Sequence, residues 1–208
     1  MGGVSARRPD WDRLAAAYDW QLPLERPALR ALLGLLDVRE DERLLDAGTG
    51  TGALLRELAR QGQPRQAVGL DRSATMLARA RPLLPPGWEL VRGDAERMPF
   101  DDASFDVVAA AYLLHILDAD QRARVLGELH RVLKPSGRVG VVTVAPPRSR
   151  VGSWLASPIH AAAKRRGGAL AGLLPLDPRS ELAGSGFHVT AYRRTRLGYP
   201  SLCVLARR

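Results

Sequence analysis

The sequence predicts an α/β fold with a doubly wound, mostly parallel sheet and helices on both of its faces. Short apolar strands alternate with helices of about ten residues between about residues 43 and 144. This alternation is typical of strands that pair in parallel through right-handed crossovers. The segment at 105–111 (FDVVAAA) is apolar almost throughout, as expected for a strand that is buried on both faces.

The elements of this alternation follow from the spacing of apolar residues and from turn residues. Ser73 stands where its side chain can cap a helix, and the segment KPSG at 134–137 is expected to turn the chain before a strand. The expected helices, which have apolar residues at helical spacing, are 53–61, 73–81 and 119–133. The expected strands are 43–47, 66–70, 88–92, 105–111 and 138–144.

Different segments flank this alternation. One or two helices precede it, and a stretch rich in Pro, Gly, Ser and Ala follows it at 145–178. We expect a single domain over residues 1–208, in which N-terminal helices within 1–37 and a cap at 145–178 form the substrate region. The remaining expected elements are helices near 11–20, 26–36 and 180–184, and strands near 187–194 and 199–206.

The composition excludes several classes of protein. Of the 208 residues, 46% are hydrophobic and 25% are charged, which is ordinary for a globular domain that buries about 70% of its unfolded surface. The single cysteine, Cys203, excludes a disulfide framework and a cysteine-based zinc site. No apolar run approaches the roughly 18 residues of a membrane span, and residues 1–10 lack the apolar stretch of a signal peptide. We therefore expect a cytoplasmic protein.

The net charge of +9 is unevenly distributed along the chain. Residues 1–137 hold 19 basic and 20 acidic side chains, whereas residues 138–208 hold 12 basic and 2 acidic ones. This asymmetry indicates an anionic partner for the last third, which could be an acidic substrate, a membrane surface or a nucleic acid. The alternative is a general compositional bias, because 29 of the 31 basic residues are arginine.

The strongest motif is LLDAGTGTG at 44–52, where a strand runs into alternating glycines and then a helix. The glycines let the backbone turn sharply and let a ligand approach it, and the helix start near Gly52 offers free N–H groups. The spacing G-x-G-x-G differs from the dinucleotide fingerprint G-x-G-x-x-G. The carboxylate of Asp46 would repel a pyrophosphate and attract an ammonium group. The motif favours a nucleoside with a cationic tail, with a purely structural glycine turn as the alternative.

Two further acidic residues follow the next two strands. Asp71 lies 19 residues after Gly52, at the position where nucleoside-binding sheets hold ribose hydroxyls, because a carboxylate can accept two hydrogen bonds from a diol. Helix capping is the alternative for Asp71. After the third strand, Asp94 can accept a hydrogen bond from an exocyclic amino group and the N–H of Ala95 can donate to a ring nitrogen. This pair indicates recognition of adenine.

Four motifs, in this order and at these intervals, resemble the class I S-adenosylmethionine-dependent methyltransferases: LLDAGTGTG, VGLDRSATML, GDAERMPFDDASFDVV and LHRVLKPSGRVGVV. The resemblance covers roughly residues 40–145 and is strongest to the small-molecule branch that includes ubiquinone/menaquinone-biosynthesis methyltransferases. A weaker similarity is to bacterial phospholipid N-methyltransferases, which the segment 145–178 does not match clearly. The resemblance implies a seven-stranded sheet whose last strand is antiparallel, S-adenosyl-L-methionine as cofactor and S-adenosyl-L-homocysteine as product.

The resemblance also implies a role for individual residues. Asp46 faces the methionine amine, Asp71 takes the ribose diol and Asp94 takes adenine with Ala95. Ala110 offers its carbonyl near the methionine part. Tyr18, in AAYDW, resembles a tyrosine that closes over the cofactor in many relatives. The cofactor-binding residues implied in this way are Tyr18, Asp46, Gly48, Thr49, Gly50, Gly52, Asp71, Arg72, Met76, Asp94, Ala95 and Ala110.

The chemistry of this cofactor limits what the protein must supply. A sulfonium methyl is already activated, so the protein mainly aligns the acceptor and excludes water, and alignment can supply roughly 7–11 kcal/mol. We predict no protein nucleophile and no metal. A general base helps only some acceptors. The candidate bases are Tyr112 and His115, which follow the fourth strand at the ligand-binding edge of the sheet, and His160 in the cap; packing or shaping the pocket is the alternative for Tyr112 and His115.

The acceptor is expected to be a small or amphiphilic molecule. The segment 153–166 combines Trp154, Leu155 and Ile159 with a basic run at 164–166. This pattern suits an amphiphile with an anionic head or peripheral contact with an anionic membrane, and a cap helix with a solvated charge run is the alternative. We expect no nucleic-acid partner, because the chain has AAAYLL where amino-methylating nucleic-acid enzymes place N-P-P-Y or D-P-P-Y. Nucleic-acid methylation and non-catalytic cofactor binding remain the alternative functions.

Overall fold

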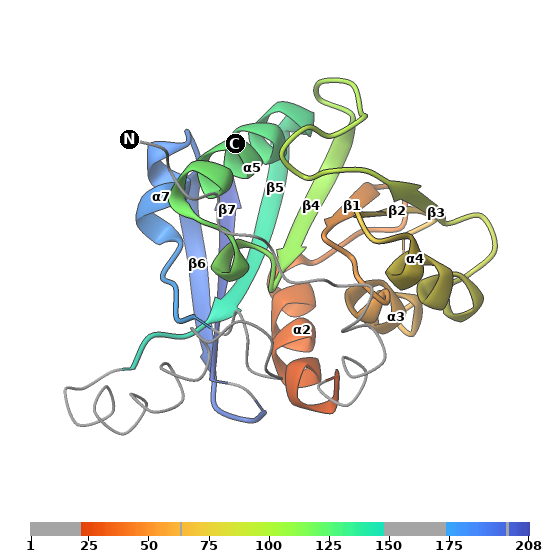
Figure 1. The fold of residues 1–208 in the computed structure, drawn as a ribbon, viewed down its shortest axis with the longest axis horizontal. Coiled ribbons are helices and arrows are strands. Elements are labelled where there is room, and N and C mark those ends of the chain that lie inside the picture. Colours follow the sequence, from red (N-terminus) through yellow and green to blue (C-terminus); the bar gives the residue numbers. More distant parts are fainter. Residues whose placement is uncertain (1–21, 63, 148–173, 199) are drawn as a thin grey trace, which may run out of the picture.

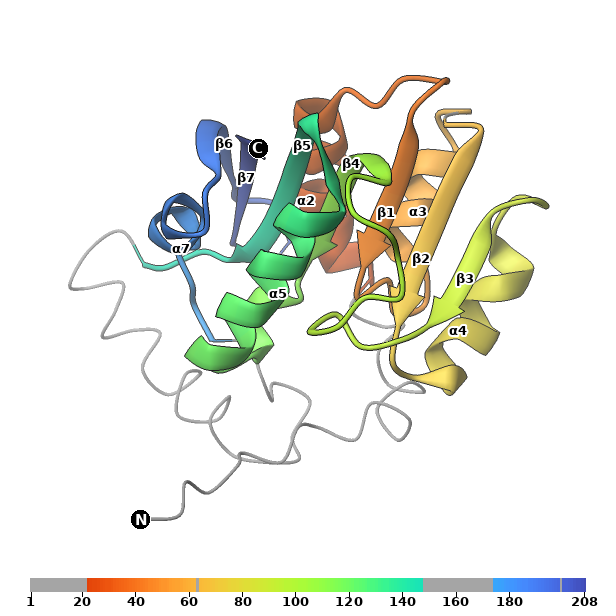
Figure 2. The ribbon, with the colours of Figure 1, turned by 90° about the horizontal axis from the view of Figure 1, so that it is seen from above.

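The computed structural model describes residues 22–62, 64–147, 174–198 and 200–208, and within them the chain forms one seven-stranded sheet (Figures 1 and 2). The strand order is β3-β2-β1-β4-β5-β7-β6. This order reverses direction at β1, which pairs in parallel with both β2 and β4. The strands are β1 (Arg43–Ala47), β2 (Gln66–Asp71), β3 (Glu89–Arg92), β4 (Phe105–Ala111), β5 (Leu133–Val144), β6 (His188–Thr195) and β7 (Ser201–Arg207).

The strand that is last in the sequence, β7, runs antiparallel to both of its neighbours in the sheet. β7 is antiparallel to β5 on one side and to β6 on the other, with Val141 opposite Val204 and Tyr192 opposite Val204. The remaining strand pairs, from β3 to β5, are parallel. The predicted fold class, a mostly parallel seven-stranded sheet with an antiparallel last strand, is therefore confirmed.

Helices cover both faces of the sheet (Figure 2). Alternate strand residues point to opposite faces, so Leu44 packs in the core under α2 (Leu22–Leu36) and α3 (Ala53–Ala59), whereas Leu45 packs in the core under α5 (Ala119–Val132) and α7 (Arg179–Gly184). α4 (Ala74–Ala80) lies beside β2 and β3 at the edge of the sheet. As predicted, the Ser73 side chain caps α4 by accepting a hydrogen bond from the N–H of Met76.

The segment 134–137 differs from its prediction as a turn. β5 begins at Leu133 and includes these residues as an irregular part of the strand. Its pairing with β4 jumps from Phe105↔Leu133 to Val107↔Arg138, so three extra residues on β5 bulge out of the ladder. Gly137 allows the close approach, because a Cβ there would lie 2.9 Å from the carbonyl oxygen of Asp106. A sequence with turn residues thus forms a bulge, since the flanking residues pair with β4.

Other boundaries differ by a few residues at most. α2 begins at Leu22 rather than 26, because Glu25 is buried one turn before Leu29 and Leu32 and extends the buried face of the helix toward its start. The predicted helix near 11–20 and the part of the 145–178 cap from 148 to 173 lie outside the described residues. Within the described ranges, no helix is both long and apolar enough to cross a bilayer.

Candidate functional site

A glycine loop joins the carboxyl end of β1 to α3. Gly48, Gly50 and Gly52 have φ angles of +74°, +55° and +76°, in the left-handed region that residues with a Cβ rarely adopt. Space is also limiting at Gly48, where a Cβ would lie 3.1 Å from the Leu113 side chain. The alternating glycines are therefore required by the backbone path, and Gly52 forms the N-cap of α3.

Asp71, the last residue of β2, holds this loop in place. Its Oδ2 accepts a hydrogen bond of 2.9 Å from the N–H of Gly50, and its Oδ1 accepts one of 2.9 Å from the N–H of Ser73. Burial raises the pKa of Asp71, and the hydrogen bonds from the backbone of Ser73 and Gly50 oppose this shift. Each carboxylate oxygen can accept a second hydrogen bond, so the group can serve the loop and a ligand together.

Asp46, the fourth residue of β1, is a buried carboxyl group beneath the loop, with 1% of its surface exposed. Its Oδ2 accepts a hydrogen bond of 2.7 Å from the Thr49 hydroxyl. Its Oδ1 is buried and has no hydrogen-bond partner among the residues that the structure describes. Burial, together with the nearby charge of Asp71, raises the pKa of Asp46 to about 7. A buried carboxylate with an unused oxygen fits the cationic group that the sequence predicts for the ligand.

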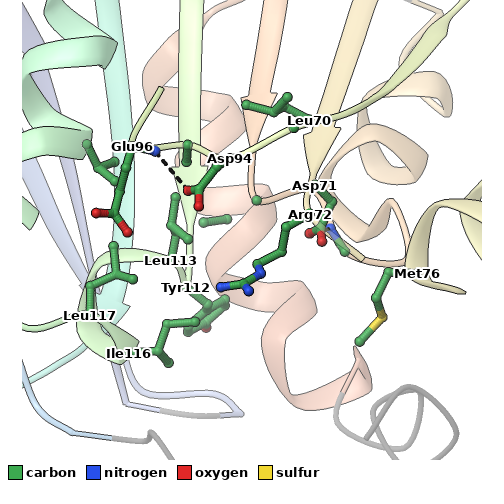
Figure 3. Close-up of a pocket in the computed structure, with 16 residues that line it drawn as sticks. Leu70, Asp71, Arg72, Met76, Asp94, Glu96, Tyr112, Leu113, Ile116 and Leu117 are labelled. Carbon is green, nitrogen blue, oxygen red and sulfur yellow. Dashed lines mark hydrogen bonds between the residues drawn. The ribbon is translucent and has the colours of Figure 1, made fainter. Parts of the chain in front are cut away.

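A cavity opens at the carboxyl ends of β1, β2 and β4, next to the loop (Figure 3). One side of the cavity is polar, and there the Oδ1 of Asp94 accepts a hydrogen bond of 3.0 Å from the N–H of Glu96. The Arg72 side chain reaches into the cavity from the side of β2 (Figure 3). The lining residues that are polar, small or glycine include Gly48, Gly50, Asp71, Arg72, Gly93, Asp94, Ala95 and Glu96.

The opposite side of the cavity is mainly apolar and comes from the segment between β4 and α5. Leu113, Ile116 and Leu117 point into the cavity from this segment (Figure 3), and Val125 of α5 also lines it. An apolar wall that faces several polar groups is typical of a site for a nucleoside-sized ligand.

Tyr112 lines the cavity and its side chain also contacts β7. Its φ angle of +56° is unusual for a residue with a large side chain. The Tyr112 hydroxyl lies 2.7 Å from the hydroxyl of Ser201, which is fully buried at the start of β7. Strained backbone at a ligand cavity is typical of functional sites, so Tyr112 is a candidate for shaping this one.

His115 packs beside Tyr112 without lining the cavity. The two rings meet edge to face with their centroids 5.8 Å apart. Burial lowers the pKa of His115 to about 4, so its imidazole is neutral at pH 7. Its Nδ1 has no hydrogen-bond partner in the described part of the chain.

Most of the residues expected from the sequence converge on this cavity, and some do not. Ala111 lines the cavity where Ala110 was expected, because Ala110 is fully buried in β4. Tyr18 and His160 lie outside the described residues. Those that line the cavity are Gly48, Gly50, Asp71, Arg72, Met76, Asp94, Ala95 and Tyr112. Those that lie behind it are Asp46, Thr49, Gly52, Ala110 and His115.

The sequence reasoning missed the apolar wall. Leu113, Leu117 and Val125 line the cavity, yet their sequence pattern is that of ordinary core residues. The position of this segment just after β4, at the edge where ligands bind in open α/β sheets, is the signal that could have pointed to it.

The fold and the cavity define a nucleoside-binding α/β protein of the class I methyltransferase type. A family model described as a methyltransferase domain matches residues 44–137. The chain is 34% identical over 157 residues to demethylmenaquinone methyltransferase of Thermotoga maritima, with 72% of this chain and 67% of the relative covered. The chain therefore belongs to the class I S-adenosylmethionine-dependent methyltransferases, and its cofactor is S-adenosyl-L-methionine.

Other relatives are covered less completely. Demethylmenaquinone methyltransferase of Chlorobaculum tepidum is 33% identical, and the match covers 71% of this chain and 63% of that protein. Malonyl-[acyl-carrier protein] O-methyltransferase of a Marinomonas species is 34% identical, with 65% and 50% covered. The chain thus spans between half and two thirds of the length of these relatives.

Solved structures support the fold. An S-adenosylmethionine-dependent methyltransferase from Mesorhizobium loti matches with a TM-score of 0.62 and 25% identity, covering 89% of this chain and 98% of that one. A methyltransferase of the same description from Aquifex aeolicus matches with a TM-score of 0.64 and 19% identity, covering 94% and 95%.

Proposed function

We propose that this methyltransferase passes the methyl group of S-adenosyl-L-methionine directly to a small-molecule or lipid-like acceptor. The observation that supports this best is the convergence of the glycine loop, Asp71 and Asp94 on one cavity at the carboxyl edge of the sheet. When bound there, the cofactor supplies an activated methyl group. The protein has to bind it, orient the acceptor in line with the S–CH₃ bond and exclude water.

The residues around the cavity have distinct roles in this proposal. Asp71 accepts hydrogen bonds from the ribose diol while it holds Gly50. Asp94 and the N–H of Ala95 contact adenine. Asp46 supplies negative charge beneath the loop for the methionine ammonium, because the field of a buried carboxylate is weakly screened. Arg72 and Met76, which line the cavity, flank the cofactor.

The acceptor is positioned by the segment after β4. Tyr112 lines the cavity and is held by Ser201, so its ring can fix the acceptor side of the site. If the acceptor must lose a proton, Tyr112 or His115 serves as the base. Tyr112 is the better placed of the two, because it lines the cavity. His115 does not line it, and burial lowers the pKa of its imidazole to about 4, which makes it a weak base.

The relatives narrow the class of acceptor. The proteins most similar to this chain include enzymes named for demethylmenaquinone and for malonyl-[acyl-carrier protein]. These names support a small-molecule or carrier-linked acceptor for this chain. None of the relatives named above favours nucleic-acid methylation or non-catalytic binding.

Peripheral contact with an anionic membrane is part of this proposal. The turn between β6 and β7 exposes Leu197, with 76% of its surface accessible, next to Arg196. Gly198 in the same turn packs against the backbone of Leu24, another exposed apolar residue. Apolar residues beside arginines suit the interface of an anionic bilayer.

A methyl-transfer assay with labelled cofactor tests this function. The acceptors are quinols, short-chain lipids, small amines and RNA, and we expect transfer to a quinol or lipid. Calorimetric titration with S-adenosylhomocysteine tests the cofactor step separately. Transfer to RNA alone, or cofactor binding without any transfer, would contradict the proposed acceptor class. Flotation with anionic and with neutral liposomes tests the membrane contact. The proposal requires that the protein float with the anionic liposomes.

A further inference from the structure

A second cavity lies between α2, α3 and the short helix η2 (Arg81–Leu83), and it shares no lining residue with the cofactor cavity. Figure 1 shows α2 and α3 side by side below the sheet, and ion pairs between them bear this out. Ala53, which directly follows the glycine loop, lines the cavity at the start of α3. The other lining residues are Leu22, Pro23, Arg26, Leu29, Arg56, Glu57, Arg60 and Leu83.

Glu57 organises the basic side of this cavity. Only 5% of this residue is exposed. Its Oε1 accepts hydrogen bonds from Arg26 and from Arg60, the latter at 2.6 Å, and its Oε2 accepts one of 3.0 Å from Arg30. Burial alone would raise the pKa of Glu57, but the hydrogen bonds from Arg30 and Arg26 outweigh burial, so its pKa lies below the ordinary value. Glu57 therefore holds three guanidinium groups, of which those of Arg26 and Arg60 belong to residues that line the cavity.

The arginines exceed the charge that Glu57 can neutralise. Each of these three guanidinium groups donates one hydrogen bond to Glu57. Each has further N–H donors that can bind another partner. Arg56 also lines the cavity, and its side chain makes no hydrogen bond or ion pair with the residues that the structure describes. Glu25, the other carboxylate on this part of α2, is buried and does not line the cavity. Three arginines, Arg26, Arg56 and Arg60, thus line the cavity together with one carboxylate.

We propose that this cavity binds a phosphate group attached to an apolar body. Guanidinium groups match the geometry of phosphate oxygens and are more effective when they are held in place beforehand, as Glu57 holds them here. The apolar body is expected from the walls, because Leu22, Leu29 and Leu83 line the same space and Leu83 is 49% exposed. The site is independent of the methyl-transfer reaction.

Calorimetry with dihexanoyl phosphatidic acid, kept below its micelle concentration, tests this site against inorganic phosphate. We expect phosphatidate to bind more tightly than phosphate. Arg56→Ala removes a side chain that makes no hydrogen bond or ion pair within the described residues, and Arg26→Ala with Arg56→Ala removes two of the donors. We expect the double variant to bind phosphatidate about ten-fold more weakly or worse. Arg65→Ala, which removes an arginine that is 77% exposed and pairs with Glu40, is the control.

The outcomes separate the possible sources of the phosphate. Binding to phosphatidylcholine vesicles only when they contain phosphatidic acid identifies a membrane-borne headgroup, and binding of the dispersed lipid alone identifies a free ligand. Equal affinity for phosphate and phosphatidate would overturn the apolar half of the proposal. Equal affinity in the double variant and in Arg65→Ala, or no binding by the natural chain, would overturn all of it. Titration with S-adenosylhomocysteine on the same samples reports the cofactor site independently.

Discussion

The carboxylate of Asp71, at the end of β2, accepts a 2.9 Å hydrogen bond from the backbone N–H of Gly50, in the loop after β1. This bond ties two neighbouring strand ends together at the point where the strand order reverses. Asp71 also lines the cofactor cavity. One side chain therefore both shapes the loop and faces the ligand.

Replacing Asp71 with Ala should weaken binding of S-adenosylhomocysteine by about 100-fold, because two charge-assisted hydrogen bonds to the ribose are lost. Isothermal titration calorimetry measures the change. Glu40→Ala, which removes an exposed carboxylate far from the cavity, should bind normally. Unchanged affinity in Asp71→Ala would place the ribose elsewhere.

Replacing Asp46 with Asn should change how stability depends on pH. Because the pKa of Asp46 in the folded chain is raised to about 7 from 3.8, the folded state keeps a proton in this range that the unfolded state has released. The natural chain should therefore lose stability relative to Asp46→Asn as the pH rises from 3.8 to about 7. Above that range the difference should be constant. Thermal melting across the range measures it.

The same variant tests the role of Asp46 toward the ligand. An ammonium group favours the ionised carboxyl, so the affinity of the natural chain for S-adenosylhomocysteine should rise as the pH rises through about 7. Asp46→Asn should bind more weakly and lose this rise. If both proteins show the same pH dependence, Asp46 does not face the ligand's charge.

Replacing Gly69 with Ala should destabilise the fold by about 1–3 kcal/mol. A Cβ at this position in β2 would lie 2.8 Å from both the Leu90 and the Thr49 side chains. Since Thr49 donates to Asp46, cofactor affinity should fall as well. Gly34→Ala, in an exposed position of α2 with nothing within 4 Å, should instead stabilise the chain by about 0.5–1 kcal/mol. Urea denaturation compares the two.

The contact between Tyr112 and Ser201 should appear as an energetic coupling. Tyr112→Phe and Ser201→Ala should each cost about 0.5–1.5 kcal/mol of unfolding free energy, and the double variant should cost less than their sum. Tyr192→Phe, at a tyrosine that is 57% exposed on β6, should stay within about 0.5 kcal/mol. Strict additivity in the double variant would mean that the two hydroxyls do not interact.

The sequence predicted the elements whose signals are local. The strand at 43–47 has paired leucines and runs into the glycine loop, and the strand at 105–111 is apolar almost throughout; both occur with these bounds. The positive φ angles of Gly48, Gly50 and Gly52 follow from residue type, because other residues resist them. Ser73 was predictable as a cap for the same kind of reason.

The features that depend on distant contacts were not predictable. The KPSG segment became a bulge because Phe105 and Val107 of β4 pair on either side of it. Ala111 lines the cavity and Ala110 is fully buried, because the pleat of β4 points consecutive side chains to opposite faces of the sheet. The arginines around Glu57 come from two helices whose packing no local pattern specifies.

The place of β7 between β5 and β6 affects the order in which the sheet can form on the ribosome. β6 leaves the exit tunnel before β7, yet in the described chain β7 is the strand with which β6 pairs. Likewise, the side of β5 that faces away from β4 has no partner strand until β7 is present. β5 therefore lacks its second neighbour until residues Ser201–Arg207 have been synthesised, and β6 joins the sheet only through β7.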